Sequence, residues 1–362
     1  MSTTSSSTPN SVSNSFLSPT FSPTNGNVTS MILPLLDDLH VHLRQDEVMT
    51  QVVGETVKGG VGRVLVMPNL KPPILTTQDA LDYKAKLQTA STELDYIMCL
   101  YLNSAQTPSE IIKAKQNGVN NVKMYPAGVT TNSQYGVDNI KSFYEIFEVM
   151  QDNDMIFNIH GEVPSNAEQN ICVLNAEISF LPLLEQIHKD FPRMRMIFEH
   201  ITTKDAVDFV AKANDKIAAT ITAHHLDLIV DNWGGNAHNY CKPVAKYPVD
   251  RQALRNAVAS GSNKFFLGSD SAPHMKGMKE SNCGCAGVYT ATYLAQYLAD
   301  CFERINCLDK IQGFATEYGA DFYQIARQTK AFELIKEPTI VSKEIHGVVP
   351  FRAGETLNWS IK

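Results

Sequence analysis

The stretch His40-Val41-His42 follows the apolar run Ile32-Leu33-Pro34-Leu35-Leu36 near the start of the chain. Alternate side chains of a β-strand point to the same face, so the two imidazoles converge on one point. Two neutral imidazoles held in this way supply half of a tetrahedral zinc site. The same pair also fits a strand end that is merely polar. The choice between a metal site and a polar strand end therefore depends on which residues lie at the ends of the later strands.

Short β-rich runs alternate with longer helical stretches from residue 31 onward. The eight runs expected to be strands are residues 33–42, 63–68, 96–102, 121–125, 155–160, 194–200, 218–223 and 264–268. The intervals expected to be helical include residues 77–90, 142–151 and 203–213. Eight such βα units over about 330 residues predict a TIM (β/α)8 barrel. An open doubly wound parallel sheet is the alternative, but its Gly-rich phosphate motif is absent from the sequence.

The first thirty residues differ in composition from the rest of the chain. They consist largely of Ser, Thr, Asn and Pro, and the first charged residue is Asp37. Such a segment buries too little apolar surface to offset its ordering entropy, so we expect residues 1–30 to form a disordered tail and residues 31–362 to form the barrel. The segment also lacks the basic region and the long apolar core of a signal peptide.

Composition argues against several classes of protein. The net charge of −7 comes without a basic stripe, which argues against a nucleic-acid partner. No apolar run approaches the length that spans a bilayer. Seven scattered cysteines, an odd number, fit reduced thiols better than a disulfide framework. We therefore expect a cytoplasmic protein with no nucleic-acid or membrane partner.

Residue types that bind metals recur at the ends of the later predicted strands. The catalytic side chains of a TIM barrel lie at the carboxyl ends of its strands. Besides His40 and His42, these ends carry Asn69, Lys123, His160, His200 and Asp270. One such residue could simply cap the barrel rim, but that explanation is hard to apply to all of them. Four imidazoles and a carboxylate predict hydrolysis assisted by two zinc ions.

Lys123 decides whether two metal ions can be held. As an ammonium it would repel both cations, and it would then be a rim lysine that pairs with a carboxylate. If its nitrogen combines with carbon dioxide, the resulting carbamate is an anion with two oxygens that can bridge two metals. The residues alone favour the rim lysine.

Longer motifs surround these residues. They are His40-Val41-His42-Leu43-Arg44, Met67-Pro68-Asn69, Val122-Lys123-Met124-Tyr125-Pro126-Ala127, His160-Gly161-Glu162-Val163, Phe198-Glu199-His200-Ile201-Thr202-Thr203 and Gly268-Ser269-Asp270-Ser271-Ala272-Pro273-His274. Together they closely resemble the dihydroorotases of the amidohydrolase superfamily, and the short, free-standing type matches best. The resemblance runs from residue 31 to residue 362, and it includes residues 279–287 and 350–356.

The resemblance implies two Zn²⁺ ions per subunit, bridged by N6-carboxylated Lys123 and a hydroxide. One zinc would take His40, His42, Asp270 and one carbamate oxygen, and the other would take His160, His200 and the second carbamate oxygen. The implied reaction is the reversible cyclisation of N-carbamoyl-L-aspartate to L-dihydroorotate plus water in pyrimidine biosynthesis. Asp270 would be the catalytic residue, because it could move a proton between the hydroxide and the ring nitrogen.

The resemblance also implies a pocket for a carboxylate that does not react. The substrate-binding residues would be His42, Arg44, Asn69, His160, Lys242, His274 and Ala286. The guanidinium fork of Arg44 can hold a carboxylate with two hydrogen bonds. Lys242 and Ala286 would contribute their main chain. Taken singly, Arg44 also fits a surface ion pair, and His274 also fits a loop histidine.

Residues 126–137, directly after the strand that carries the lysine, are polar and contain Gly. They resemble a mobile lid in which Thr130 and Thr131 close over the substrate and exclude water. An ordinary βα loop is the alternative. The resemblance further implies a homodimer.

Some residues of reactive types match no ligand position. We expect these to be structural or to lie behind the ligands, and they are His224, His225 and His238. We assign no chemistry to the thiols of Cys283 and Cys285.

Three alternatives remain open. A related cyclic-amide hydrolase acting on hydantoins or dihydropyrimidines would share the metal ligands. Arg44, Asn69 and His274 argue against it, because those substrates lack the extra carboxylate. A catalytically inactive scaffold protein would be expected to have lost ligands, and this chain has lost none. The third alternative is a barrel that is active only within a multienzyme complex.

Overall fold

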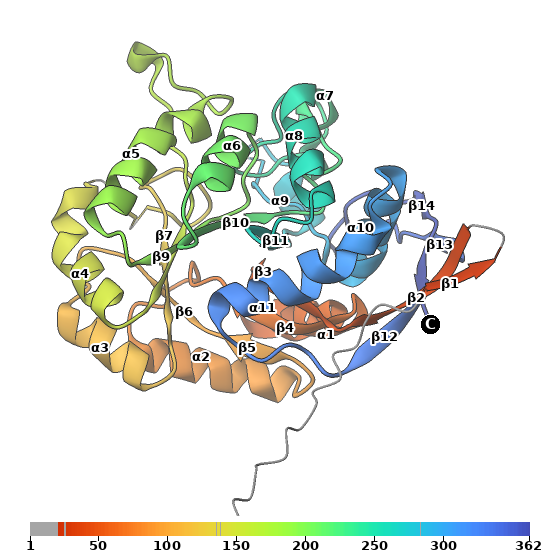
Figure 1. Cartoon of the computed structure of the whole chain (residues 1–362), viewed down its shortest axis with the longest axis horizontal. Coiled ribbons are helices and arrows are strands. Elements are labelled where there is room, and N and C mark those ends of the chain that lie inside the picture. Colours follow the sequence, from red (N-terminus) through yellow and green to blue (C-terminus); the bar gives the residue numbers. More distant parts are fainter. Residues whose placement is uncertain (1–20, 25–26, 135, 138, 283) are drawn as a thin grey trace, which may run out of the picture.

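Parallel strands form the centre of the molecule, and helices surround them (Figure 1). The structure is a computed structural model that describes residues 21–24, 27–134, 136–137, 139–282 and 284–362. The strands of the barrel are β3 (Leu36–Val41), β4 (Val61–Val66), β5 (Asp95–Ile97), β6 (Cys99–Tyr101), β7 (Asn121–Met124), β8 (Ile156–Ile159), β9 (Arg195–Phe198), β10 (Ile217–Ile221) and β11 (Phe265–Leu267). Their order along the chain is also their order around the barrel. The predicted TIM barrel is confirmed.

Two places in the barrel depart from a continuous ladder of strands. The third strand position is divided between β5, which pairs with β4, and β6, which pairs with β7, so the expected strand at residues 96–102 is interrupted at Met98. The barrel closes just beyond β11. There the Asp270 amide donates to the His40 carbonyl (2.8 Å), and the His42 amide donates to the Ser271 carbonyl (3.1 Å). This closure sets the ends of the first and last strands side by side.

Helices cover the outside of the strands. The longer ones are α1 (Asp46–Lys58), α2 (Thr77–Ala90), α3 (Pro108–Gln116), α4 (Tyr144–Asp152), α5 (Ala176–Asp190), α6 (Lys204–Lys212), α8 (Pro248–Ala259) and α10 (Leu294–Arg304). The predicted helix at residues 77–90 is α2, which begins after Thr76 because the Thr76 hydroxyl accepts from the Asp79 amide (3.1 Å). The helix expected at 142–151 begins instead with a 3-10 turn (Ile140–Phe143).

The short helix α11 (Tyr318–Tyr323) covers the amino end of the barrel. Arg63 near the start of β4 donates to the Ala326 carbonyl (2.8 Å), and Arg195 at the start of β9 donates to the Phe322 carbonyl (2.7 Å). The Tyr323 hydroxyl reaches into the barrel and donates to the Asn158 side chain (3.0 Å). With the amino end closed in this way, the carboxyl end is the one that can hold a site.

A small antiparallel sheet lies beside the barrel (Figure 1). Its strands, in order, are β1 (Phe21–Thr24), β2 (Asn27–Pro34), β12 (Ala331–Ile335) and β15 (Ser360–Ile361), and a separate hairpin pairs β13 (Thr339–Ile340) with β14 (Thr356–Leu357). The single strand expected at residues 33–42 is therefore wrong, because it is divided between this sheet and the barrel. Pro34 has no amide proton with which to continue the ladder, and the Leu35 amide donates instead to the Lys330 carbonyl (2.9 Å).

The expected boundary between tail and barrel, at residue 31, falls inside β2. Ser30 of β2 is paired with Ile335 of β12, and the Thr29 carbonyl accepts from the Lys336 amide (2.8 Å). This pairing joins segments about 300 residues apart, so local composition could not reveal it. Residues 1–20 lie outside the described residues, and disorder there stays a prediction.

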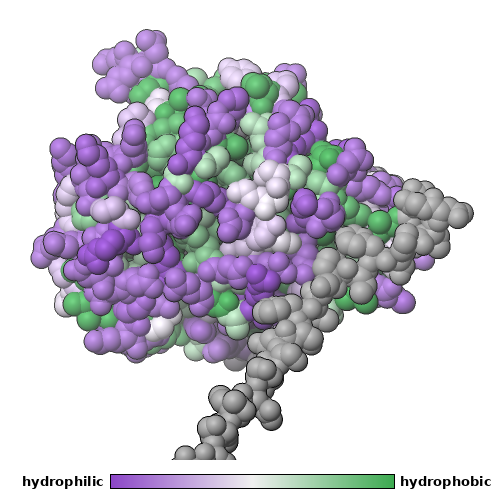
Figure 2. All heavy atoms as spheres, in the orientation of Figure 1, coloured by the Kyte–Doolittle hydropathy of each residue, from purple (hydrophilic) through white to green (hydrophobic). Residues whose placement is uncertain are grey.

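The surface seen in Figure 2 is mostly hydrophilic, and apolar side chains are scattered over it. Scattered apolar residues are normal on a folded domain and mark no particular partner. Over the described part of the chain, no helix combines the length and the apolar character that a bilayer crossing requires.

Short helices α7 (Val230–Trp233) and α9 (Lys276–Lys279) lie in the long loops that follow β10 and β11. The first of these loops runs to α8, and the second runs to α10. Both loops approach the carboxyl end of the barrel, where they supply parts of the candidate site described next.

Candidate active site

A pocket opens at the carboxyl end of the barrel. Every predicted site residue lines it except Lys123 and His274. Lys123 is fully buried, and His274 lies against the pocket residues Arg44 and Ala286. The structure therefore brings together at one place residues that the sequence spreads over 247 positions, from His40 to Ala286.

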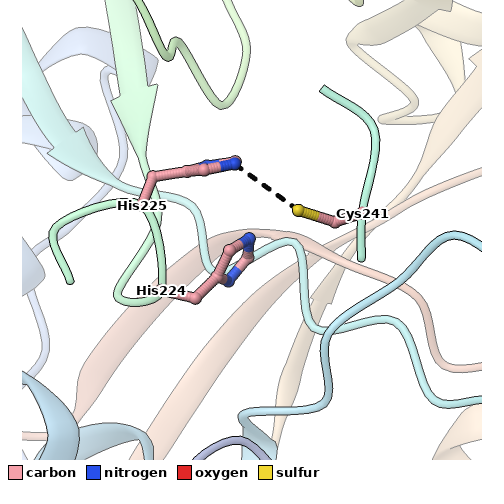
Figure 3. A group of neighbouring side chains, drawn as sticks. All are labelled: His224, His225 and Cys241. Atoms are coloured by element: carbon pink, nitrogen blue, oxygen red, sulfur yellow. Dashed lines mark hydrogen bonds between the residues drawn. The ribbon is translucent and has the colours of Figure 1, made fainter. Parts of the chain in front are cut away.

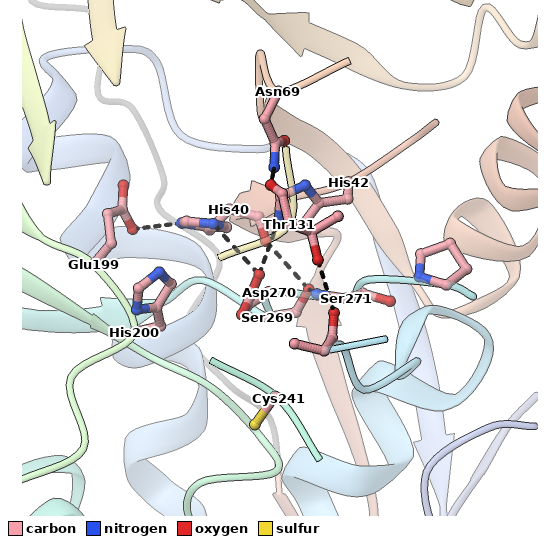
Figure 4. A network of polar contacts seen from close by, with 12 residues as sticks. His40, His42, Asn69, Thr131, Glu199, His200, Cys241, Ser269, Asp270 and Ser271 are labelled. Carbon is pink, nitrogen blue, oxygen red and sulfur yellow. Dashed lines mark hydrogen bonds and ion pairs between the residues drawn. The ribbon is translucent and has the colours of Figure 1, made fainter. Parts of the chain in front are cut away.

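His40, His42 and Asp270 form the tightest cluster in the pocket (Figure 4). Asp270 Oδ1 lies 3.0 Å from His42 Nε2 and 3.5 Å from His40 Nε2. The Asp270 backbone is left-handed, with φ of 47°, which is strained for a residue other than glycine. Strain of this kind is retained where the surrounding structure fixes a functional side chain in position.

His160 and His200 complete the group of imidazoles. The ring centroids of His160 and His200 are 4.7 Å apart, and those of His40 and His200 are 4.9 Å apart. Burial lowers the pKa of all four site histidines, most strongly for His40 and His200. Neutral imidazoles are the form that binds metal ions.

Two buried carboxylates orient these imidazoles. Glu199 Oε2 lies 2.9 Å from His40 Nδ1, and Glu162 Oε2 lies 2.9 Å from His160 Nε2. Each contact fixes one ring nitrogen and leaves the other available to a metal, an arrangement common around metal-bound histidines. We did not single out Glu162 and Glu199 from the sequence. A signal was present, because each lies within two residues of a predicted ligand.

Lys123 is buried without a hydrogen-bond partner for Nζ among the described residues. Its Nζ lies 5.1 Å from the ring centroid of Tyr125. Burial lowers the pKa of Lys123 to about 8. An unpaired ammonium is costly to bury, so this site raises the fraction of Lys123 that is present at neutral pH as the neutral amine, which is the form that reacts with carbon dioxide. The residues alone favoured a rim lysine paired with a carboxylate. The structure instead contains a buried lysine whose Nζ has no hydrogen-bond partner among the described residues.

Asp270 remains ionised despite its burial. Burial would raise the pKa of Asp270, but the hydrogen bond to His42 and the electrostatic effects of His40, His42 and Lys123 outweigh it and lower the pKa to about 2. The site therefore combines an ionised carboxylate with four neutral imidazoles at neutral pH, and the buried Lys123 has a lowered pKa.

Arg44 lines the same pocket, and His274 lies against Arg44. Arg44 Nε donates to the Pro273 carbonyl (3.0 Å), and Arg44 Nη2 lies 3.1 Å from His274 Nε2. The same His274 nitrogen lies 2.9 Å from the Ala286 carbonyl. One ring nitrogen cannot accept from Arg44 and donate to Ala286 at the same time, so one of these contacts is not a hydrogen bond. Burial lowers the pKa of Arg44 to about 10, which leaves it cationic at neutral pH.

The loop at residues 126–137 reaches over this side of the pocket. The Asn69 side-chain amide donates to the Thr131 carbonyl (3.0 Å), and the Thr131 hydroxyl lies 3.5 Å from the Ala286 carbonyl. The Asn132 side chain in turn donates to the Asn69 carbonyl (2.9 Å). The loop thus joins Asn69 to Ala286 across the pocket. Tyr135, within it, lies outside the described residues.

A second buried group of ligand-type residues comprises His224, His225 and Cys241 (Figure 3). His225 Nδ1 lies 2.9 Å from the Thr222 hydroxyl, and His225 Nε2 lies 3.0 Å from the Pro243 carbonyl. Both ring nitrogens of His225 are therefore engaged, and they fasten the loop after β10. This agrees with a structural role. His238 pairs with Glu280 (3.0 Å) away from the cluster, and Cys283 lies outside the described residues.

Comparisons with known proteins give a consistent result. The model of the amidohydrolase family matches residues 31–346. A dihydroorotase of Mycosarcoma maydis is 45% identical in an alignment of 323 positions that covers 82% of each chain. A dihydroorotase of Saccharomyces cerevisiae is 42% identical in an alignment of 360 positions that covers 92% of this chain and 99% of that protein.

Solved structures agree. The crystal structure of the Saccharomyces cerevisiae dihydroorotase in complex with 5-fluoroorotic acid superposes with a TM-score of 0.90 at 40% identity, covering 92% of this chain and 99% of that chain. A D-hydantoinase structure superposes with a TM-score of 0.74 at 14% identity, covering 91% of this chain and 82% of that chain, and this likeness concerns the fold alone.

Proposed function

This chain belongs to the dihydroorotase family of amidohydrolases, and we propose that it catalyses the reversible cyclisation of N-carbamoyl-L-aspartate to L-dihydroorotate with release of water. The observation that carries the proposal is one pocket lined by two unlike groups. A cluster of imidazoles and a carboxylate suited to metal ions lines the pocket together with Arg44, a cation suited to a carboxylate. Dihydroorotate has both a hydrolysable ring amide and a carboxylate that does not react.

The donor set fits two zinc ions. His40, His42 and Asp270 would hold one, and His160 and His200 would hold the other. Lys123 would be shared after carboxylation, in which its Nζ forms a bond to the carbon of CO₂ and releases a proton. The unpartnered, fully buried Nζ and the lowered pKa of Lys123 support this modification. When bound, the two ions would lower the pKa of water and polarise the scissile carbonyl.

Asp270 is the proposed catalytic residue. In the hydrolytic direction a water oxygen forms a bond to the ring carbonyl carbon, and the bond from that carbon to the ring nitrogen breaks. Asp270, ionised at neutral pH, takes the proton from the water and delivers it to the departing nitrogen. In the synthetic direction the same carboxylate removes the proton from the ureido nitrogen.

The other pocket residues would hold the substrate. Arg44, Asn69 and His274 would bind the carboxylate that does not react, and the main chain at Lys242 and Ala286 would contact the ring. His42 and His160 line the same space and would face the substrate as well. Placing the carboxylate away from the proposed metal ions would keep it from competing with the scissile carbonyl for those ions.

The loop at residues 126–137 is the proposed lid. Thr130 and Thr131 line the pocket, and Thr131 bridges towards Ala286. Closure over the substrate would exclude bulk water and strengthen the polar contacts inside.

We also propose that the protein is a cytoplasmic homodimer with residues 1–20 disordered. The free state of the six described cysteines supports a reducing compartment. Light scattering of the purified full chain would give the mass of the particle, and a monomer would contradict the dimer.

Turnover of L-dihydroorotate before and after zinc removal tests the proposed function. We expect a chelator to abolish turnover and added zinc to restore it, with two zinc ions per chain at full activity. Native mass spectrometry of the restored protein should show the added mass of one CO₂, which Lys123→Ala should lack. A protein that keeps full activity without metal would contradict the proposal.

A further inference from the structure

Lys279, at the end of α9, is a buried cation whose hydrogen bonds within the described residues all go to the main chain, and its Nζ also lies 5.9 Å from the centroid of the Tyr240 ring. Its side chain is enclosed in the loop after β11, and the residue is 4% exposed. Its Nζ donates to the carbonyls of Tyr240 (2.8 Å), Cys285 (2.8 Å) and Gly287 (2.7 Å). An ammonium has three N–H donors, so these three bonds use all of them.

The three carbonyls belong to two segments that are far apart in the sequence. Tyr240 lies in the loop after β10, two residues before Lys242, and Cys285 and Gly287 flank Ala286 in the loop after β11. The Gly287 amide also donates to the Tyr240 carbonyl (2.9 Å). Lys279 therefore ties both segments to one point.

Both segments form a wall of the candidate pocket. Lys242, Ala286 and Gly287 line the pocket, whereas Lys279 does not. The Ala286 carbonyl is further contacted by His274 Nε2 (2.9 Å) and by the Thr131 hydroxyl (3.5 Å). A shift of this carbonyl would disturb the carboxylate side of the pocket and the lid together.

A side chain without N–H or O–H donors could not replace these contacts. Three buried carbonyl oxygens that point at one place repel each other and remain unsatisfied unless a donor lies between them, and a charged donor binds them most strongly. The adjoining backbone is closely packed, because a Cβ added at Gly287 would lie 2.6 Å from the Ala272 carbonyl oxygen. The ammonium of Lys279 thus stabilises this arrangement of the wall.

We propose that Lys279 is a positioning residue for substrate binding, holding the main chain at residues 240–242 and 285–287 in the arrangement that contacts the ring of the substrate. The inference rests on the proposed dihydroorotase function, but it concerns a residue outside the pocket. Lys279 touches neither the metal cluster nor the proposed path of the proton. Its loss should therefore weaken substrate binding more than it slows the chemical step.

The test compares Lys279→Met with Lys276→Met in zinc-loaded full-length protein. Lys276 lies on the same short helix, but its side chain is half exposed and its Nζ is 4.0 Å from Glu344. For Lys279→Met we expect KM for dihydroorotate to rise about tenfold or more, because a wall of the binding pocket is lost, while kcat changes less than about threefold and the zinc content stays at two. Lys276→Met should match the wild type.

Hydrogen–deuterium exchange gives a readout that does not depend on activity. In Lys279→Met, exchange should increase both around residue 240 and at residues 285–287, and both should remain protected in Lys276→Met. If Lys279→Met does not fold, Lys279→Arg serves instead. Its planar guanidinium keeps the charge but cannot aim three donors as the ammonium does, so KM should rise by a smaller factor.

The outcomes separate the two proposals. A zinc-loaded wild type that does not turn over dihydroorotate overturns the proposed function and the role of Lys279 with it. An active wild type whose Lys279 variants show unchanged KM overturns the role of Lys279 alone. The role of Lys279 is likewise overturned if the Lys279 variants lower kcat while KM stays constant.

Discussion

Lys123 is the residue on which the proposed two-metal site depends. Replacing it with alanine would remove the buried amine and with it the only side chain proposed to be shared by both metals. We expect Lys123→Ala to lower the turnover of dihydroorotate at least about a thousandfold, equivalent to about 4 kcal/mol of barrier, and to reduce the zinc content. Steady-state kinetics and metal analysis would measure both effects.

The matched control for this prediction is Lys86→Ala, which removes an exposed lysine from α2. Its activity and zinc content should equal those of the wild type. A short carboxylic acid added to Lys123→Ala should restore part of the activity, because it can supply the two oxygens of the absent carbamate. A fully active Lys123→Ala would show that the lysine is not shared between metals.

Asp38 is a buried carboxyl directly behind the histidines that are proposed to bind metal. It accepts from the Ser269 amide (2.8 Å) and from the Ser269 hydroxyl (2.5 Å). Burial raises the pKa of Asp38 from 3.8 to about 7, although these hydrogen bonds lower it. Because the pKa is higher in the folded state, folding takes up a proton. The resulting contribution to stability is complete below about pH 4 and is lost as the pH rises through about 7.

Asp38→Asn should remove this part of the pH dependence. An amide can still accept from the Ser269 amide, and it does not titrate. In metal-free protein we expect the free energy of unfolding of the wild type to decrease between about pH 4 and pH 8 relative to that of the variant. Denaturant titrations across this range would measure the difference, and parallel pH profiles for the two proteins would refute the assignment.

The loop at residues 126–137 is the element that we expect to control access to the pocket. Thr131→Ala removes a hydroxyl that faces Ala286, whereas the main-chain contact to Asn69 remains. We expect kcat/KM for dihydroorotate to fall about tenfold, or about 1.4 kcal/mol, without a change in the melting temperature.

Ser142→Ala, at an exposed position in the turn before α4, is the control for the lid. It should leave kcat/KM unchanged. Equal values for Thr131→Ala and the wild type would favour an ordinary βα loop.

The sequence predicts most of the elements because their signals are local. The strands β4, β7, β8, β9, β10 and β11 lie within one or two residues of the expected runs, and the capping pair at Thr76 and Asp79 marks the start of α2. The predictions fail where a segment that is distant in the sequence determines how a strand pairs. Residues 33–42 divide into two strands because β12, which comes from the other end of the chain, pairs with the first half.

The sequence also predicts most of the candidate site, because the residues that line the pocket lie at the ends of strands. Ligand types at strand ends identify the residues facing the pocket, since the fold aims those positions inward. The residues that orient these ligands are harder to predict from the sequence. Glu162 and Glu199 belong to quoted motifs, but their contacts with His160 and His40 depend on how the side chains turn. Lys279 acts through three carbonyls on two loops, and no spacing in the sequence reveals that arrangement.

On the scale of the whole molecule, β2 attaches the amino-terminal segment to the carboxyl-terminal sheet. Met31 and Leu33 of this strand are fully buried. Deleting residues 1–20 should leave the melting temperature within about 2 °C of the wild type, whereas deleting residues 1–34 should lower it by about 10 °C or more, because two buried side chains and a strand are lost.

Calorimetry of the two truncated proteins measures this difference, and the activity of the shorter deletion provides the control. A large loss of stability on removing residues 1–20 would contradict the predicted disorder there. An unchanged melting temperature on removing residues 1–34 would contradict the role of β2.

The proposed function depends on a metal cluster and a carboxylate-binding cation sharing one pocket. Its most direct test is the initial rate of hydrolysis of L-dihydroorotate by the zinc-loaded protein, beside hydantoin and dihydrouracil under the same conditions. All three rings contain a hydrolysable amide, but only dihydroorotate has a carboxylate for Arg44. We predict turnover of dihydroorotate and none of the neutral rings. Hydrolysis of hydantoin or dihydrouracil in its place, or of no ring at all, would contradict the account.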